Sequence, residues 1–141
     1  QSKADALFSG GMLLDIICGL GITCSRQRFV DDDEQALLLP SDFSYSYQFK
    51  MHRRGDQLLK FKDFAPKVFH RIRKHFGVSE ADILASFTVE NLKWQKGEGK
   101  SGALMMFTKD HRFILKTANK EERDFLWGFL PYYLKHIKKN P

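Results

Sequence analysis

Glycine, lysine and serine gather in the sequence GEGKSG at residues 97–102. Backbone N–H groups bind phosphate oxygens well where the chain can approach closely, and glycine permits that approach. The residues that could contact a phosphate are Gly97, Gly99, Lys100, Ser101 and Gly102. The segment therefore predicts either a phosphate-binding loop or an ordinary glycine-rich turn in which the lysine is only a solubilising charge.

An apolar run, a polar tip and a second apolar run follow the glycines, and the second run, FILK, ends in Lys116. The spacing does not fit the P-loop, which has four residues between its first glycine and GK and leads from a strand into a helix. It fits a loop between two strands, as in protein kinases, where a glycine-rich flap covers ATP and a lysine on a nearby strand contacts the phosphates.

A carboxylate would fix the position of Lys116, and the next segment offers Glu121, Glu122 and Asp124. An inward apolar stripe of a helix is expected at Leu126, Phe129, Leu130 and Tyr133. Counting back four and seven residues from the first two of these gives Glu122, which is therefore the predicted partner of Lys116. The alternative is a surface ion pair that contributes well under ~1 kcal/mol to stability.

The segments before the glycines supply the elements that must position this site. Apolar spacing over residues 4–20 predicts an amphipathic helix, and the acidic run DDDE at 31–34 predicts a solvated loop. Residues 36–40 and 44–52 have strand patterns, and the second alternates apolar and polar side chains as a half-buried strand does.

Residues 60–77 give the clearest helical pattern, with Pro66 near the first turn and Gly77 as terminator. The expected apolar stripe is Val68, Phe69, Ile72 and Phe76, and the expected charged face is Lys67, His70, Arg71, Arg73, Lys74 and His75. Ser79 is expected to cap a short helix, and a last helix should be bent or broken at Pro131. The whole indicates an α+β fold with a mostly antiparallel sheet flanked by helices.

Composition limits the classes of function. The 141 residues suit one domain, and the net charge of +6 favours acidic partners such as nucleotides, phosphoinositides or an anionic membrane. We expect no nucleic-acid binding, because no aromatic stacking platform is present, and no metal site, because histidines and cysteines lack ligand spacing. Cys18 and Cys24 favour a reducing, cytosolic setting, and residues 7–22 are too short and glycine-rich to span a membrane.

Five segments together resemble the phosphatidylinositol phosphate kinases in order and spacing, over residues 12–141. GKSGALMMFTKDHRFILKT is similar to that family's glycine-rich loop and ATP-lysine strand. The other four segments are LGITCSRQ, ALLLPSDFSYSYQFKM, FKDFAPKVFHRIRKHFGVSEADILASF and EERDFLWGFLPYYLKHIKKNP.

The resemblance implies a kinase-like N-terminal lobe, of the kind shared with SAICAR synthases, at residues 36–141, preceded by a helix and acidic linker at 1–35. It implies transfer of the ATP γ-phosphate to an inositol-ring hydroxyl of a membrane phosphoinositide. The glycine loop and Lys116 fall on the ATP-phosphate site, and Glu122 on the carboxylate that pairs with the lysine. The family's catalytic Asp and Mg²⁺ ligands lie in a C-terminal lobe that this sequence does not contain, so the chain alone is expected to be inactive.

The charged helix face gives a second hypothesis, a non-catalytic module that binds anionic lipid or a partner protein. Its membrane-facing residues would be Lys67, Arg71, Arg73 and Lys74, unless these charges only solvate the helix. A cytoplasmic protein, peripheral at membranes and able to pair through its N-terminal helix, is expected. The ring position that is phosphorylated, the oligomeric state and the regulation stay open.

Overall fold

The computed structural model describes residues 10–28, 37–52, 57–96 and 104–140. Within these ranges the chain forms helices and two small antiparallel sheets, which confirms the predicted α+β class. The elements, in chain order, are α2 (Gly10–Arg28), α3 (Pro40–Ser44), β1 (Ser46–His52), β2 (Leu58–Phe64), α4 (Pro66–His75), α5 (Glu80–Ser86), the 3-10 turn η1 (Val89–Asn91), β3 (Leu92–Lys96), β4 (Leu104–Thr108), β5 (Ile114–Lys116) and α6 (Lys120–Lys139). One sheet is the hairpin β1–β2, and the other has the order β3–β4–β5.

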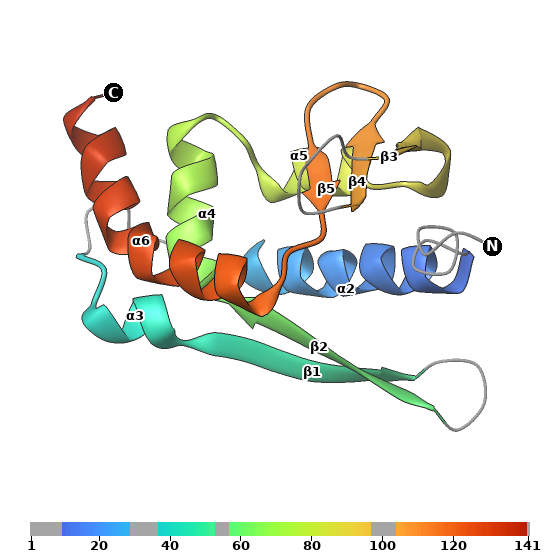
Figure 1. The fold of residues 1–141 in the computed structure, drawn as a ribbon, viewed down its shortest axis with the longest axis horizontal. Helices are drawn as coiled ribbons and strands as arrows, with labels where there is room; N and C mark the ends of the chain where they lie inside the picture. The colour runs from blue at the N-terminus through green and yellow to red at the C-terminus, as the bar shows by residue number, and fades with distance from the viewer. Residues whose placement is uncertain (1–9, 29–36, 53–56, 97–103, 141) are drawn as a thin grey trace.

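Helix α2 lies between the two sheets (Figure 1). On the side of the hairpin β1–β2, Gly19 is so close to the ring of Phe61 that a Cβ atom at this position would overlap the ring. On the other side, Cys24 is buried together with Ile83 and Phe87, which come from α5 and its C-terminal cap. Helix α2 therefore packs against both parts of the fold.

A second buried cluster joins α4 to α6, which Figure 1 shows at the end of the molecule away from the N-terminus. Its buried members are Ala65, Val68, Leu130, Leu134 and Ile137. Phe43 of α3 packs against this cluster, and its carbonyl oxygen accepts a hydrogen bond from Trp127 Nε1 of α6. The short helix α3 is thus fixed to the last helix of the chain.

Several local predictions are confirmed. Strand β1 alternates exposed and partly buried side chains from Tyr47 to His52, and it pairs with β2 in antiparallel register. Pro66 opens α4, and Gly77 adopts a φ of +73° just beyond the C-terminal end of that helix. Ser79 caps α5, where its hydroxyl accepts from the Asp82 N–H and its own N–H donates to the Asp82 carboxylate.

Three predicted boundaries are wrong. The segment 60–64, expected as helix, is the end of β2, because KFKDF alternates apolar and charged residues and pairs with β1. Residues 37–39 form no strand, and Pro40 instead opens α3, where the Asp42 carboxylate accepts from the Leu39 N–H at 2.7 Å. The first helix extends to Arg28, whereas residues 4–9 and 31–34 lie outside the described residues.

The stripe predicted for the last helix is also wrong in part. Leu126 and Phe129 are 49% and 45% exposed, whereas Leu130 is 1% exposed and Leu134 and Ile137 are buried beside it. The apolar surface of α4 faces this second stripe, and that long-range contact decides which side of α6 is buried. The helix does not break at Pro131, although Figure 1 shows that it changes direction along its length. Phe76, expected in the stripe of α4, is exposed.

The substitution Leu130→Ala should lower the free energy of unfolding by about 2–5 kcal/mol, because it leaves a cavity in the α4–α6 cluster. The matched control Leu126→Ala removes the same atoms from an exposed position and should change this free energy by less than about 1 kcal/mol. Urea unfolding followed by circular dichroism measures both values. Equal losses for the two variants would contradict the assignment of the buried face.

Candidate functional site

The site predicted from the glycines and Lys116 centres on the hairpin β4–β5. Strand β4 pairs with β5 so that Met105 lies opposite Lys116. Along the sequence, β3 ends at Lys96 and β4 begins at Leu104, which confirms that the glycine segment connects two strands. Its five predicted phosphate-binding residues, Gly97, Gly99, Lys100, Ser101 and Gly102, lie outside the described residues.

Lys116 ends β5, and its Nζ atom lies 3.7 Å from Glu122 Oε2 in the first turn of α6. The two side chains are 50% and 36% exposed, so this ion pair contributes well under ~1 kcal/mol to stability. Asn119 caps α6, and its side-chain oxygen accepts from the Glu122 N–H at 2.8 Å. The cap therefore fixes the start of α6, which places Glu122 in the first turn of that helix, six residues after Lys116.

The other two carboxylates of this segment lie differently. Glu121 is exposed, and Asp124 Oδ1 lies 3.5 Å from Arg123 Nε. The structure thus pairs Lys116 with Glu122, as the residue count predicted, although the stripe used for that count is largely exposed. The catalytic role of the pair stays a prediction.

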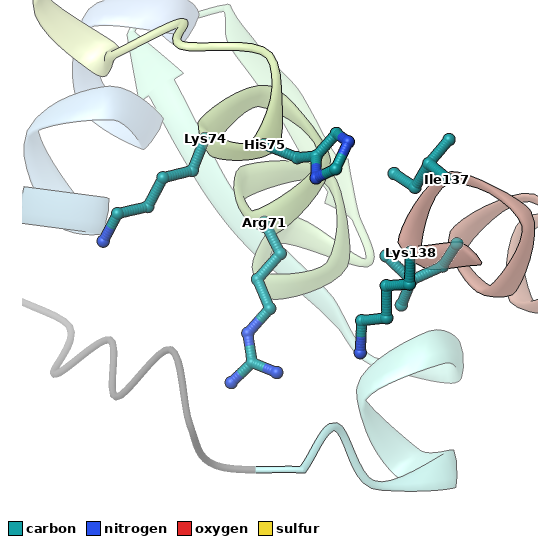
Figure 2. Close-up of a pocket in the computed structure, with 6 residues that line it drawn as sticks. Arg71, Lys74, His75, Ile137 and Lys138 are labelled. Atoms are coloured by element: carbon teal, nitrogen blue, oxygen red, sulfur yellow. The ribbon is translucent and has the colours of Figure 1, made fainter. Parts of the chain in front are cut away.

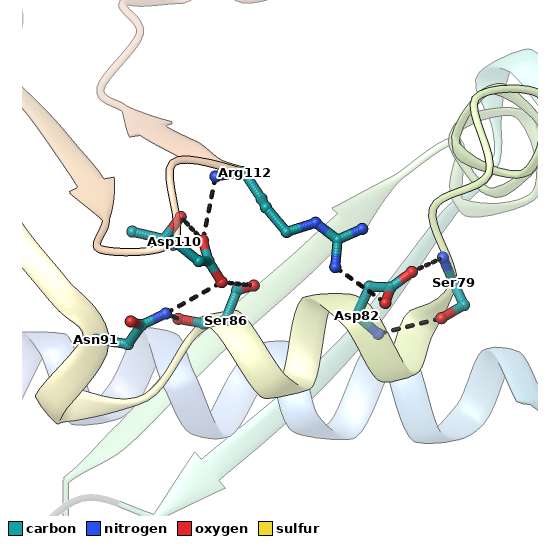
Figure 3. A network of polar contacts seen from close by, with 7 residues as sticks. Ser79, Asp82, Ser86, Asn91, Asp110 and Arg112 are labelled. Carbon is teal, nitrogen blue, oxygen red and sulfur yellow. Dashed lines mark hydrogen bonds and ion pairs between the residues drawn. The ribbon is translucent and has the colours of Figure 1, made fainter.

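A polar network, which the sequence analysis missed, holds the turn between β4 and β5 (Figure 3). The Asp110 carboxylate accepts hydrogen bonds from Ser86 Oγ and Thr108 Oγ1, both at 2.6 Å, and from the Arg112 N–H at 3.1 Å. Asn91 Nδ2 adds a longer contact of 3.3 Å. The sequence signal that could have revealed part of it is an aspartate in a turn, which commonly accepts from the backbone two residues on.

These contacts connect the hairpin to α5. Ser86 and Thr108 are fully buried. Their hydrogen bonds hold the pKa of the Asp110 carboxyl well below its usual range, and the bond from Ser86 has the larger effect of the two. Beside them, Arg112 NH1 lies 3.0 Å from Asp82 Oδ1. This hydrogen bond, together with those from Ser79, lowers the pKa of Asp82 to about 2. The hairpin that carries Lys116 is therefore fixed to α5 by two ionised carboxylates.

Two of the four residues predicted to face a membrane, Arg73 and Lys67, form ion pairs, and the predicted membrane contact stays a prediction. Arg73 NH2 lies 3.5 Å from the buried Glu80 Oε1, which also hydrogen bonds with His70 Nδ1. Burial alone would raise the pKa of Glu80, but the contacts from His70 and Arg73 lower it below its usual value. Lys67 Nζ lies 4.0 Å from Asp42 Oδ2.

Neither a candidate metal site nor a membrane-spanning helix occurs among the described residues. Among these residues, no group of three or more His, Cys, Asp and Glu side chains is arranged to hold a metal ion. None of the described helices is long and apolar enough to cross a membrane.

Comparison with known proteins gives consistent matches. The profile of a family described as Phosphatidylinositol-4-phosphate 5-Kinase matches residues 86–141. A phosphatidylinositol 4-phosphate 5-kinase of Schizosaccharomyces pombe is 35% identical over 90% of this chain and 18% of its own length. A probable phosphatidylinositol phosphate kinase of Dictyostelium discoideum is 42% identical over 58% of this chain and 12% of its own length.

The phosphatidylinositol 4-phosphate 5-kinase type-1 beta of Mus musculus is 38% identical over 58% of this chain and 15% of its own length. The chain thus spans less than a fifth of the length of each of these three relatives. The profile match includes Lys116, Glu122 and the whole of the Asp110 network.

The Asp82–Arg112 contact predicts a pH-dependent stability. The ionised Asp82 stabilises the fold above about pH 4, the usual pKa of an aspartate in an unfolded chain. This contribution is lost as the pH falls toward the pKa of about 2 that Asp82 has in the folded protein. At neutral pH, Asp82→Asn should therefore lower the melting temperature, and the gap to the unchanged protein should close between about pH 4 and pH 2.

Thermal unfolding followed across this pH range measures the gap. Arg112→Gln, which removes the partner instead, should show the same narrowing. A gap that stays constant down to the lowest pH would contradict the assigned role of the carboxylate.

Proposed function

The chain belongs to the phosphatidylinositol phosphate kinase family, and we propose that it forms the ATP-binding lobe of such an enzyme. The observation that carries this proposal is the contact of 3.7 Å between Lys116 Nζ and Glu122 Oε2, which joins the end of β5 to the first turn of α6. A lysine on a strand that pairs with a helix carboxylate is the arrangement by which protein kinases place a cation against ATP phosphates.

In this function Lys116 contacts the nucleotide phosphates, and Glu122 keeps its ammonium group in place. Residues 97–102 would approach the same phosphates with backbone N–H groups, and Lys100 and Ser101 would add a cation and a hydroxyl. These groups act by positioning and by neutralising charge that develops on the transferred phosphoryl group, which is where a preorganised cation contributes most.

The substrate class follows from the family. An inositol-ring hydroxyl of a membrane phosphoinositide attacks the γ-phosphorus of ATP, the bond to the β-phosphate oxygen breaks, and ADP and the hydroxyl proton leave. The relatives named above are described as 4-phosphate 5-kinases, which makes phosphatidylinositol 4-phosphate the first substrate to test. Mg²⁺ would neutralise the phosphates of bound ATP, and no group of three or more His, Cys, Asp and Glu side chains among the described residues is arranged to hold it.

The chain would form one part of a larger enzyme. Residues 36–141 would form the N-terminal lobe, with residues 1–35 as a helix and linker before it. Because the chain spans 18% of its Schizosaccharomyces relative, the general base and metal ligands would come from other segments, and the chain alone would be inactive.

The protein would act from the cytoplasm at the face of a membrane, and its net charge of +6 would contribute to the attraction between the two. Leu14 and Ile22, exposed on α2, would be available for pairing of two copies.

The test introduces Lys116→Met into the full-length protein and follows ATP-dependent phosphorylation of phosphatidylinositol 4-phosphate in vesicles. We expect the turnover number to fall by about 100-fold or more, because a preorganised charge at the reacting phosphate is lost. Lys120→Met is the matched control, since this lysine is also exposed and lies four residues further on, outside the pair. Undiminished activity of Lys116→Met, or an equal loss in Lys120→Met, would refute the role of Lys116.

A further inference from the structure

A cavity of about 290 Å³ lies between the end of β2, the helix α4 and the first half of α6. This volume is near the lower end of the range of about 300–1,000 Å³ that is usual for ligand pockets, which indicates a small ligand. The cavity is separate from the one in Figure 2, which lies between α4 and the C-terminal half of α6 and has Leu134 and Ile137 as its apolar wall. It is also separate from the Lys116–Glu122 pair, because neither residue lines it.

Most of the cavity wall is aromatic. The rings of Phe64 and Trp127 meet edge to face, with their centroids 4.9 Å apart, and Phe69 of α4 adds a third ring. Leu126 completes this part of the wall, although about half of its side chain is exposed. Aromatic rings pack favourably against one another in edge-to-face and offset arrangements. The wall therefore suits a ligand with an aromatic ring, which would also cover Leu126.

Asp63 gives the cavity a carboxylate with an unused hydrogen-bonding capacity. This residue is partly buried, and its carboxylate accepts no hydrogen bond from the described residues. Burial raises the pKa of the Asp63 carboxyl, and the nearby charges of Arg73 and Arg26 offset this effect only in part. Since polar groups inside proteins are nearly always hydrogen-bonded, a ligand that donates to Asp63 would satisfy this carboxylate.

Arg123 gives the cavity a cation. Its guanidinium carbon lies 5.6 Å from the centre of the Phe64 ring, and its Nε atom lies 3.5 Å from Asp124 Oδ1. That ion pair is weak, because both side chains are about half exposed, and the outer nitrogens of the guanidinium can bind a ligand carboxylate with two parallel hydrogen bonds. Arg73, the other cation of the wall, is balanced by the buried Glu80.

We propose that this cavity binds a free α-amino acid with an aromatic side chain. The ammonium group of the ligand donates to Asp63, its carboxylate accepts from Arg123, and its ring packs against the aromatic wall. A zwitterion matches the one carboxylate and the one available cation of the cavity, and an α-amino acid is small enough for its volume. The ligand would connect β2 to the start of α6. The proposal is independent of the proposed kinase function, because it uses neither Lys116 nor Glu122.

The binding test titrates the protein with L-phenylalanine by isothermal calorimetry. We expect one site per chain, and the indole N–H signal of Trp127 should shift in NMR spectra as this site fills. L-alanine has the same charged groups but no ring, and it should bind about tenfold more weakly or worse.

Two analogues and two variants test the charged contacts separately. Phenylalanine amide lacks the carboxylate and N-acetylphenylalanine lacks the ammonium group, so each should bind about tenfold more weakly than L-phenylalanine. Asp63→Asn and Arg123→Gln should each cause a similar loss for L-phenylalanine. Asp63→Asn should cause no further loss for N-acetylphenylalanine, and Arg123→Gln none for phenylalanine amide, because the contact in question is already absent.

Controls and ligand source are included in the same series. Glu121→Gln and Lys120→Gln remove exposed charges at the start of α6 that do not line the cavity, and each should change the affinity by less than about twofold. Arg123→Gln changes an exposed side chain and should leave the melting temperature nearly unchanged, so it tests the proposal even where Asp63→Asn fails to fold.

Three results would overturn the proposal. The first is absence of L-phenylalanine binding, and the second is equal weakening by the cavity and control variants. The third is binding of either analogue as tightly as L-phenylalanine, because a peptide terminus would then be the better ligand.

Discussion

A two-stranded hairpin is at best marginally stable by itself, and a three-stranded sheet needs a buried apolar face, so each sheet depends on a helix packed against it. Helix α2 meets this need for both sheets, because the absence of a side chain at Gly19 admits the ring of Phe61 on one side. On its other side, Cys24 reaches the cluster formed with α5. The sheet that carries Lys116 is therefore connected to the rest of the fold mainly through α2 and α5.

The position of the site follows from this arrangement. The hairpin β4–β5 is fixed to α5 by the carboxylates of Asp110 and Asp82, and the cap at Asn119 starts α6 directly after the hairpin. Lys116 and Glu122 consequently meet at a junction that is set by short-range sequence and by charge-assisted hydrogen bonds. The pair itself is partly exposed and adds little stability, so its geometry is a consequence of the fold around it.

The sequence alone was sufficient to predict the structure where that structure depends on residues close together in the chain. Pro66, Gly77 and Ser79 were predicted correctly, because helix starts and stops depend on local backbone chemistry. It was insufficient where distant segments decide. The strand at 58–64 depends on pairing with β1, and the buried side of α6 depends on α4. The Asp110 network joins four segments, so only its turn aspartate had a local signal.

The central claim is that Lys116 is the lysine that contacts ATP. The most direct measurement treats the protein with a lysine-reactive ATP analogue and identifies the modified residues by mass spectrometry, with and without excess ATP. The account predicts that Lys116 is modified in preference to other exposed lysines, such as Lys109 and Lys120, and that ATP prevents this modification. Modification of Lys116 at the same level as those two lysines, unchanged by ATP, would contradict it.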